Sequence, residues 1–320
     1  PRNGASRDRQ RCRPSPARMT NRHWFTVPSS VKHSDRSNDG GPTPQEAGWV
    51  SLRWGRTWVR EAGPRSGPPI VLIHGATVPH WSFDRLTPCL AAAGYRVICF
   101  DLYGHGLSDR PATDYTVTLF RQQAQELLAT LGLAGPLPVL GYSLGAAIAA
   151  DLCLQDPGVV ERLVLVAPLW NFSDHSRWSS AIKRPIIGPL VLRHIGIPVL
   201  RIRRRRRYRA IGLGHLGERF ERESGDRGFR QALLSMERSG ALGDQSHRYR
   251  ALGDSACPRL LISAGEDRIV PPAHSHSIRL LIEPCQAHTF QGLEHNLMLT
   301  APERVSGAVT AFLQRPPIHG

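Results

Sequence analysis

Short runs of apolar residues recur along the chain from Gly48 onward, and each ends at a glycine, a proline or a polar residue. Segments with helical spacing of apolar residues alternate with these runs. Strands that are apolar throughout belong in a sheet whose two faces are both covered. The predicted strands are a pair at 49–60 that turns at Gly55, then 69–74, 96–101, 137–142, 162–166 and 259–263, and the predicted helices are 80–93, 115–132, 144–155 and 302–314. This alternation predicts an α/β fold, a doubly wound and mostly parallel sheet with helices on both faces.

The alternation stops between Pro168 and Ala256, where short helix-like pieces, glycines and a block of arginines replace it. In open α/β sheets ligands bind at the carboxyl ends of the strands, so an insertion over that edge would form a lid. We therefore expect a basic, disordered tail at 1–45, a core at 46–168, a helical lid insertion at 169–255 and the rest of the core at 256–320.

The net charge of +15 is unevenly distributed. Lys and Arg outnumber Asp and Glu by 9 to 3 in residues 1–45 and by 18 to 8 in residues 169–255, whereas the rest of the chain holds 14 against 15. No helix-turn-helix, zinc-finger or RNA-recognition signature accompanies the arginines, so we expect no nucleic-acid partner. The core is neutral, and the positive charge belongs to the tail and the insertion.

Residues 1–45 are rich in Arg, Ser, Pro, Asn and Gly and show no helical or strand period, which predicts a solvated tail. One alternative is an Arg-rich, acid-poor transit peptide, although the prolines disfavour an amphipathic helix. Another is a natural start at Met19, which would leave residues 1–18 outside the natural protein.

The six cysteines form no CxxC pair, and Cys99, Cys153 and Cys285 lie in apolar runs, which predicts buried reduced thiols. We recognise no secretory signal. The longest apolar stretch, 186–200, contains Arg193 and His194 and is shorter than the roughly 18 apolar residues of a membrane-spanning helix. We expect a cytoplasmic protein.

The segment Gly141-Tyr142-Ser143-Leu144-Gly145 follows a predicted strand and opens an alanine-rich helix. A nucleophile elbow requires this context, because its serine stands on a sharp, strained turn where glycines let neighbouring backbones approach. The helix N-terminus there favours a developing negative charge. We interpret Ser143 as the catalytic nucleophile, and the alternative is a Gly-Ser turn that only packs a helix on the sheet.

A serine hydroxyl needs a base, and the base needs an orienting carboxylate. Behind a nucleophile elbow the acid and then the histidine follow in chain order. Asp267 comes directly after a predicted strand, and His295 precedes the last predicted helix. We expect both side chains to project toward Ser143 and to complete a catalytic triad.

Four other residues compete for these two roles. Glu266 neighbours the predicted acid, and His288 lies inside a predicted strand, where a structural role is expected. His274 and His276 are expected to be exposed near the start of a helix. Their H-x-H spacing also suits a metal, but no carboxylate or cysteine set joins them, so we predict no metal site.

The tetrahedral intermediate of acyl transfer needs two backbone donors for its oxyanion. The amide of Leu144, at the start of the helix, is the first candidate. The second is the amide of Ala76, in the segment His74-Gly75-Ala76-Thr77 that follows an early strand.

Together these segments resemble the α/β-hydrolase superfamily, in particular its lidded branch of esterases, monoacylglycerol-type lipases and carbon–carbon bond hydrolases. The resemblance runs from about Gly48 to the C-terminus and implies eight strands with the second antiparallel, and no cofactor. It also implies a structural role for the turn at 101–111. The motifs that carry it are His74-Gly75, the run from Asp101 to Pro111, the elbow, Gly265-Glu266-Asp267 with Pro271, and Leu293-Glu294-His295.

The sequence favours hydrolysis of a carboxylic ester, small or lipid-like, through an acyl-enzyme on Ser143. Carbon–carbon bond hydrolysis or acyl transfer on the same residues stays open, because the lid sets specificity. Related epoxide hydrolases and haloalkane dehalogenases carry Asp at this position, which disfavours their chemistries. A non-enzymatic, hydrolase-like binding protein is disfavoured because all three triad residues are present.

Seven arginines lie within 201–209, directly after the apolar stretch 186–200. An apolar lid helix flanked by arginines would hold the protein on an anionic membrane, each arginine near the surface contributing roughly 1 kcal/mol. The alternative is a solvated, charged helix face, which charge runs usually form. Both interpretations stay open at this stage.

Overall fold

The computed structural model describes residues 46–133, 135–172 and 179–315. The predicted tail at 1–45 lies outside these residues. Within the described part of the chain, none of the helices combines the length and the apolar character that crossing a bilayer would need.

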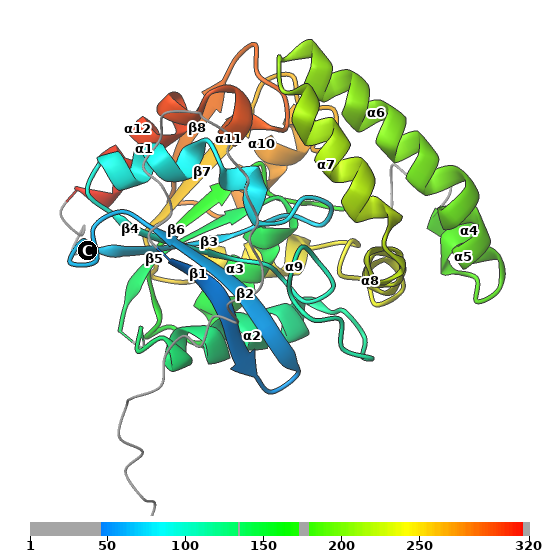
Figure 1. The fold of residues 1–320 in the computed structure, drawn as a ribbon. Helices are drawn as coiled ribbons and strands as arrows, with labels where there is room; N and C mark the ends of the chain where they lie inside the picture. Colours follow the sequence, from blue (N-terminus) through cyan, green and yellow to red (C-terminus); the bar gives the residue numbers. More distant parts are fainter. Residues whose placement is uncertain (1–45, 134, 173–178, 316–320) are drawn as a thin grey trace, which may run out of the picture. The chain divides into compact units, whose positions relative to one another are not determined.

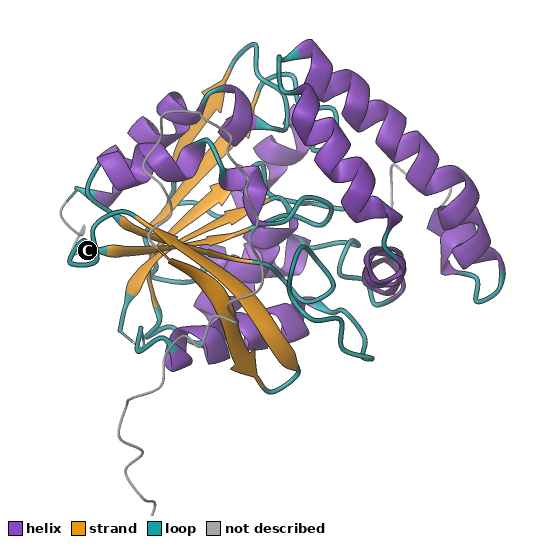
Figure 2. Ribbon diagram, viewed as in Figure 1, coloured by secondary structure: helices purple, strands orange, loops and turns teal. Residues whose placement is uncertain are grey.

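Eight strands form one sheet in the order β1-β2-β4-β3-β5-β6-β7-β8 (Figures 1 and 2). The strands are β1 (Glu46–Leu52), β2 (Gly55–Ala62), β3 (Pro69–Ile73), β4 (Arg96–Phe100), β5 (Leu137–Tyr142), β6 (Val160–Val166), β7 (Arg259–Ala264) and β8 (Gln286–Phe290). Only β2 runs against its neighbours β1 and β4, and every other pair is parallel. The predicted eight-stranded, mostly parallel sheet with its second strand antiparallel is confirmed.

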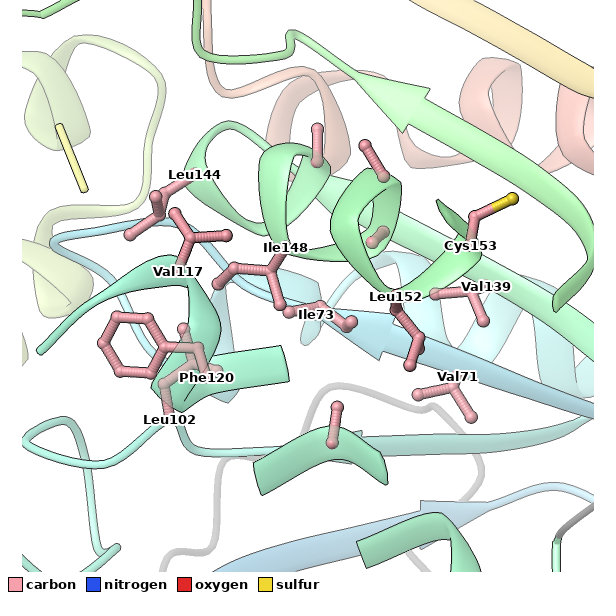
Figure 3. Close-up of a cluster of buried hydrophobic side chains, with 14 of the residues drawn as sticks. Val71, Ile73, Leu102, Val117, Phe120, Val139, Leu144, Ile148, Leu152 and Cys153 are labelled. Atoms are coloured by element: carbon pink, nitrogen blue, oxygen red, sulfur yellow. The ribbon is translucent and has the colours of Figure 1, made fainter. Parts of the chain in front are cut away.

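Helices cover both faces of this sheet, which explains why its central strands are apolar throughout. On β3, Val71 and Ile73 pack into one apolar cluster (Figure 3), and Ile70 and Leu72 pack into another on the opposite face. The first cluster is shared with α2 (Val117–Thr130), α3 (Leu144–Gln155), α9 (Ser246–Gly253) and α10 (Pro272–Leu281), and the second with α1 (Leu86–Ala92) and α12 (Pro302–Leu313).

The predicted helix at 80–93 is divided into a 3₁₀ turn, η1 (His80–Phe83), and α1 (Leu86–Ala92). Pro88 has no amide hydrogen to donate to the carbonyl of Asp84, so one unbroken helix cannot form there.

Between β6 and β7 the chain forms a series of helices, of which only the last packs on the sheet as a core helix. These are α4 (Ser179–Lys183), α5 (Ile187–Val191), the π-helical η3 (Leu192–Gly196), α6 (Ile197–Ala210), α7 (Gly214–Gly225), α8 (Arg227–Arg238) and α9. In Figure 1, α6 and α7 lie side by side, away from the sheet. Their side chains Tyr208 and Phe220 form a third apolar cluster with Phe229 of α8 and Trp81 of η1. We refer to α4–α8 as the inserted helices.

The described cysteines carry no disulfide. Cys99 and Cys153 are buried, as predicted, but the prediction for Cys285 is wrong because its side chain is only half-buried. Cys285 directly precedes β8, which is an edge strand of the sheet and is therefore covered less completely than the central strands.

Candidate active site

Ser143 stands on the tight turn between β5 and α3 with φ = 54°, in the left-handed region that residues other than glycine rarely adopt. The flanking glycines permit this turn. A Cβ atom on Gly141 would overlap the carbonyl oxygen of Gly145, and one on Gly145 would overlap that of Ile73. The Ser143 amide donates to the carbonyl of Val166 (3.0 Å), which fixes the strained residue to the sheet.

His295 and Asp267 form a buried pair, with His295 Nδ1 2.7 Å from Asp267 Oδ2. The second carboxylate oxygen, Oδ1, accepts hydrogen bonds from the amides of Ile269 and Val270, both at 2.8 Å. Hydrogen bonds to both oxygens fix the carboxylate, and a fixed carboxylate holds the imidazole with its proton on Nδ1. This leaves Nε2 as the nitrogen that can accept a proton.

One cavity of about 270 Å³ has Ser143, His295 and Ala76 on its wall. The loop that carries Ala76 lies against the serine, since a Cβ on Gly75 would be 3.2 Å from that of Ser143. Leu144 is the first residue of α3, so its amide is among those that a helix leaves without an intrahelical acceptor. The structure thus brings all five predicted site residues together, with Asp267 behind His295.

The competing residues lie elsewhere or face away. Glu266 and His276 are exposed. His274 was expected to be exposed, but its ring is half-buried and lies 6.0 Å from that of Trp170. His288 lies inside a strand, as predicted, but β8 is an edge strand and leaves this side chain exposed. Within the described residues, no three His, Cys, Asp or Glu side chains are grouped as a metal site requires.

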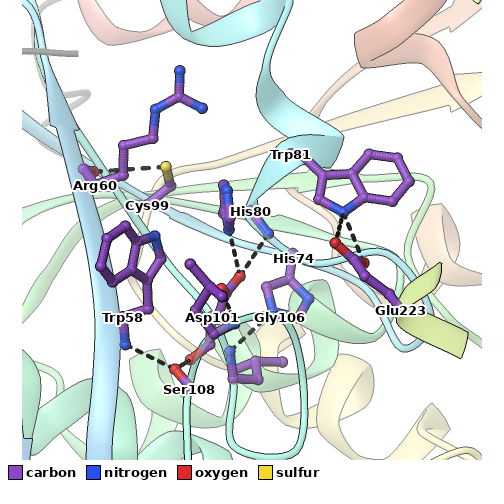
Figure 4. A network of polar contacts seen from close by, with 12 residues as sticks. Trp58, Arg60, His74, His80, Trp81, Cys99, Asp101, Gly106, Ser108 and Glu223 are labelled. Carbon is purple, nitrogen blue, oxygen red and sulfur yellow. Dashed lines mark hydrogen bonds and ion pairs between the residues drawn. The ribbon is translucent and has the colours of Figure 1, made fainter. Parts of the chain in front are cut away.

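Buried histidines support the loop that carries Ala76 (Figure 4). His74 Nε2 accepts a hydrogen bond from the amide of Leu102 (2.9 Å), so its proton is on Nδ1, which donates to the carbonyl of Gly75 (2.7 Å). Burial, with a smaller contribution from the nearby His105, lowers the pKa of His74 to about 3. A neutral His74 is therefore part of the folded structure at neutral pH.

Asp101, fully buried, organises the turn that the resemblance interpreted as structural. Its Oδ1 lies 2.8 Å from His80 Nδ1, and its Oδ2 accepts from the amide of Leu107 (2.9 Å). Burial alone would raise the pKa of Asp101, but the charge and the hydrogen bond of His80 outweigh burial and lower it to about 2. This carboxylate lies close to His74 and His80 (Figure 4) and is not among the residues that line the cavity.

Sequence reasoning missed two residues that pack directly on the site. Tyr142 Oη lies 3.2 Å from the carbonyl oxygen of His295 and 3.3 Å from Asn296 Oδ1, and its ring centroid is 5.1 Å from that of His295. Burial raises the pKa of Tyr142 well above its usual range, so it stays a phenol. Both residues are direct neighbours of predicted site residues, which is the signal that could have identified them.

Residues 70–308 match the model of the alpha/beta hydrolase family. The match spans well over half of the chain, so the chain belongs to this family, as its sequence motifs predicted, and is an α/β-hydrolase enzyme. A pimeloyl-[acyl-carrier protein] methyl ester esterase of Xanthomonas axonopodis pv. citri is 29% identical over 260 residues, which are 78% of this chain and 97% of that protein.

Two further similarities place the chain more broadly. An uncharacterized protein of Mycobacterium tuberculosis is 28% identical over 260 residues, 78% of this chain and 76% of its own. The solved structure of a meta-cleavage product hydrolase from Pseudomonas fluorescens superposes with a TM-score of 0.69 at 23% identity, over 83% of this chain and 97% of that one. This structural similarity shows that the two proteins share a fold.

Proposed function

We propose that the protein hydrolyses a carboxylic ester through an acyl-enzyme on Ser143. The observation that carries this proposal is the buried His295–Asp267 pair, whose histidine shares one cavity wall with a strained serine. Ser143 Oγ attacks the ester carbonyl carbon while His295 Nε2 takes the hydroxyl proton, and Asp267 stays ionised and orients the ring. The amides of Leu144 and Ala76 donate to the oxyanion.

The intermediate then collapses, the bond to the alcohol oxygen breaks, and the alcohol leaves with the proton from His295. Water enters, gives a proton to the same nitrogen and attacks the acyl carbon, which releases the acid and restores Ser143. The Xanthomonas relative is a methyl ester esterase, which supports an ester as the substrate. Carbon–carbon bond hydrolysis and acyl transfer would use the same residues and are the alternatives.

The cavity wall suggests the class of acyl group. Beyond the serine and histidine it is mostly apolar, and much of it comes from the inserted helices, which we propose act as a lid. A chain entering this cavity gains roughly 0.8 kcal/mol per buried methylene, about three- to fourfold in kcat/KM. The apolar wall includes Leu169, Ile182, Val191, Leu192, Val199, Leu233 and Leu242.

An ester series tests both parts of this proposal. We expect p-nitrophenyl esters to be hydrolysed with kcat/KM rising from acetate to medium-chain acyl groups, and Ser143→Ala to abolish turnover. Ser51→Ala, on the exposed side of β1, is the matched control and should behave like the wild type. Cleavage of a diketone without ester hydrolysis would favour the carbon–carbon alternative, and a preference for acetate would contradict a lipid-like acyl group.

The same helices also support contact with an anionic membrane. Large apolar side chains remain exposed along the continuous helix formed by α5, η3 and α6, and two of them, Ile195 and Val199, line the cavity as well. The others on this face are Ile187, Leu190 and Ile202, and exposed arginines follow at 203, 205, 206 and 209. We propose that this face lies on anionic lipid with the mouth of the cavity toward the acyl chains.

Co-sedimentation with vesicles tests the proposed contact with an anionic membrane. We expect binding to phosphatidylglycerol vesicles, weaker binding to phosphatidylcholine vesicles, and loss of binding in Ile195→Gln/Ile202→Gln. Leu280→Gln is the control, because Leu280 is equally exposed but lies on α10. Equal binding to both kinds of vesicle, or no binding, would contradict the proposal.

A further inference from the structure

Arg204 is the one arginine of the 201–209 block that is buried, with 8% of its surface exposed. It comes from α6, an inserted helix, and lines the same cavity as Ser143. Burying a guanidinium is costly unless its hydrogen-bonding groups are satisfied. Among the described residues, the groups that Arg204 hydrogen-bonds or stacks on are neutral. They are Thr77, Asn296 and the ring of Phe220, whose centroid lies 5.8 Å from the guanidinium carbon.

The two hydrogen bonds of Arg204 reach both sides of the catalytic machinery. Nη2 donates to Thr77 Oγ1 at 2.9 Å, and Nη1 donates to Asn296 Oδ1 at 3.4 Å. Thr77 follows Ala76, the proposed oxyanion donor, and Asn296 follows His295. Arg204 therefore contacts both the residue next to the proposed oxyanion donor Ala76 and the residue next to His295.

Residues 74–77 carry the proposed oxyanion donor Ala76, and we call them the oxyanion loop. Three consecutive residues of this loop are each contacted by a buried side chain. His74 Nδ1 donates to the carbonyl of Gly75, and His105 Nε2 lies 2.9 Å from the carbonyl of Ala76. Both histidines belong to the core. The third contact, from Arg204 to the Thr77 hydroxyl, comes from α6, outside the core. The position of α6 therefore affects the position of the loop at Thr77.

We infer that Arg204 is a positioning residue, through which packing of α6 on the core sets the geometry of the oxyanion loop. The kinetic part of this inference rests on the proposed acyl-enzyme function. Removing a whole oxyanion donor typically costs about 100- to 1000-fold in kcat. Loosening a donor that two other contacts still hold should cost less, about tenfold, and should act on kcat rather than on KM because the oxyanion exists only in the reacting state.

Thr77 offers the cleanest test, because Thr77→Val replaces only the hydroxyl by a methyl group, whereas Thr77→Ser keeps the hydroxyl and removes only the methyl group. Thr77→Val removes the acceptor and Thr77→Ser keeps it. We expect Thr77→Val to lower kcat for a p-nitrophenyl ester about tenfold with KM within about twofold, and Thr77→Ser to stay within about twofold of the wild type. Arg204→Met should resemble Thr77→Val or be more impaired, since it also loses the contact with Asn296. Arg222→Gln, at an exposed arginine of α7, is its control.

The double variant and amide exchange make the inference falsifiable. Thr77→Val should add nothing to Arg204→Met, because both remove the same bond. Hydrogen exchange of the peptide 74–79 should be faster in Thr77→Val than in Thr77→Ser. Multiplicative losses of kcat, or equal exchange in the two Thr77 variants, would overturn the inference. The exchange measurement decides the structural claim even if the wild type hydrolyses no ester, a result that would refute the proposed function instead.

Discussion

The sheet and the inserted helices are held by different kinds of contact. On β3, Ile70, Val71, Leu72 and Ile73 are wholly buried, and apolar helices cover them on both sides. The inserted helices share an apolar cluster with η1, and Ala232 and Met236 of α8 belong to the first core cluster, but many of their other contacts with the core are polar. These polar contacts include Trp81–Glu223, Arg110–Asp226, Arg207–Glu294 and those of Arg204.

This difference suggests a division of labour. Apolar burial on both faces of a sheet is worth about 1.5–3 kcal/mol per side chain, whereas partly exposed ion pairs contribute about 0–1 kcal/mol each. The core can therefore keep Ser143, Asp267 and His295 in place while the inserted helices vary in position or sequence. The following predictions test that division, beginning with the largest effect.

Asp267→Asn should lower kcat about 10⁴-fold, because an amide cannot accept from His295 while keeping both backbone hydrogen bonds, and the imidazole then adopts the wrong tautomer. The melting temperature should change little compared with this loss. Steady-state kinetics and a thermal melt on the same sample measure both. A loss of activity that merely follows loss of folded protein would show that the core does not hold the pair independently.

Gly145→Ala should destabilise the fold by more than about 4 kcal/mol, because the new Cβ would overlap the carbonyl of Ile73 and force β3 and α3 apart. Gly307→Ala is the control. It lies inside α12 with open space around it and should stabilise by roughly 1 kcal/mol. Urea unfolding of both variants gives the values, and similar stabilities would contradict the close approach at the elbow.

Acid should destabilise the core through His74. The pKa of His74 is lowered to about 3 in the folded state, so the unfolded chain takes up a proton first as the pH falls. The contribution of neutral His74 to the free energy of unfolding is complete above the ordinary pKa of about 6.5. About 3 kcal/mol of this contribution is lost between pH 7 and pH 4. His74→Asn keeps a donor and an acceptor but cannot titrate. Urea unfolding at both pH values should therefore show a weaker pH dependence in this variant, and an unchanged dependence would refute the role of His74.

Trp81→Phe should loosen the junction of the inserted helices by about 2 kcal/mol. Trp81 Nε1 donates to both carboxylate oxygens of Glu223 at 2.9 Å (Figure 4), and without it a mostly buried carboxylate keeps only Arg219 as a partner. Trp54→Phe, at an exposed tryptophan, should change stability by less than about 0.5 kcal/mol. Amide exchange that increases in α7 but not in β3 would support the division, and an equal increase in both would contradict it.

The sheet and the elbow were predictable because their sequence signals are local. Runs such as 69–73 are apolar in every position only where both faces are covered, and the turn itself requires the spacing of Gly141 and Gly145 around Ser143. The order of Asp267 and His295 then followed from the fold. The proposed catalytic roles of these residues and the cytoplasmic location stay predictions.

The role of Arg204 was not predictable in the same way. It stands between Arg203 and Arg205, and only the rotational phase of α6 against the core decides which arginine is buried. That phase depends on long-range packing with Trp81 and Phe220 rather than on the local pattern. The turn at 101–111 was also predictable only in part. Its sequence indicated a structural role for the turn but not the contact between Asp101 and His80.

The most direct measurement is the site of covalent labelling by a fluorophosphonate, read from peptide masses. An acyl-enzyme on Ser143 predicts one adduct, on the peptide that contains Ser143, with no labelling in Ser143→Ala and slow labelling in His295→Ala. An adduct on another residue that persists undiminished in Ser143→Ala would contradict it.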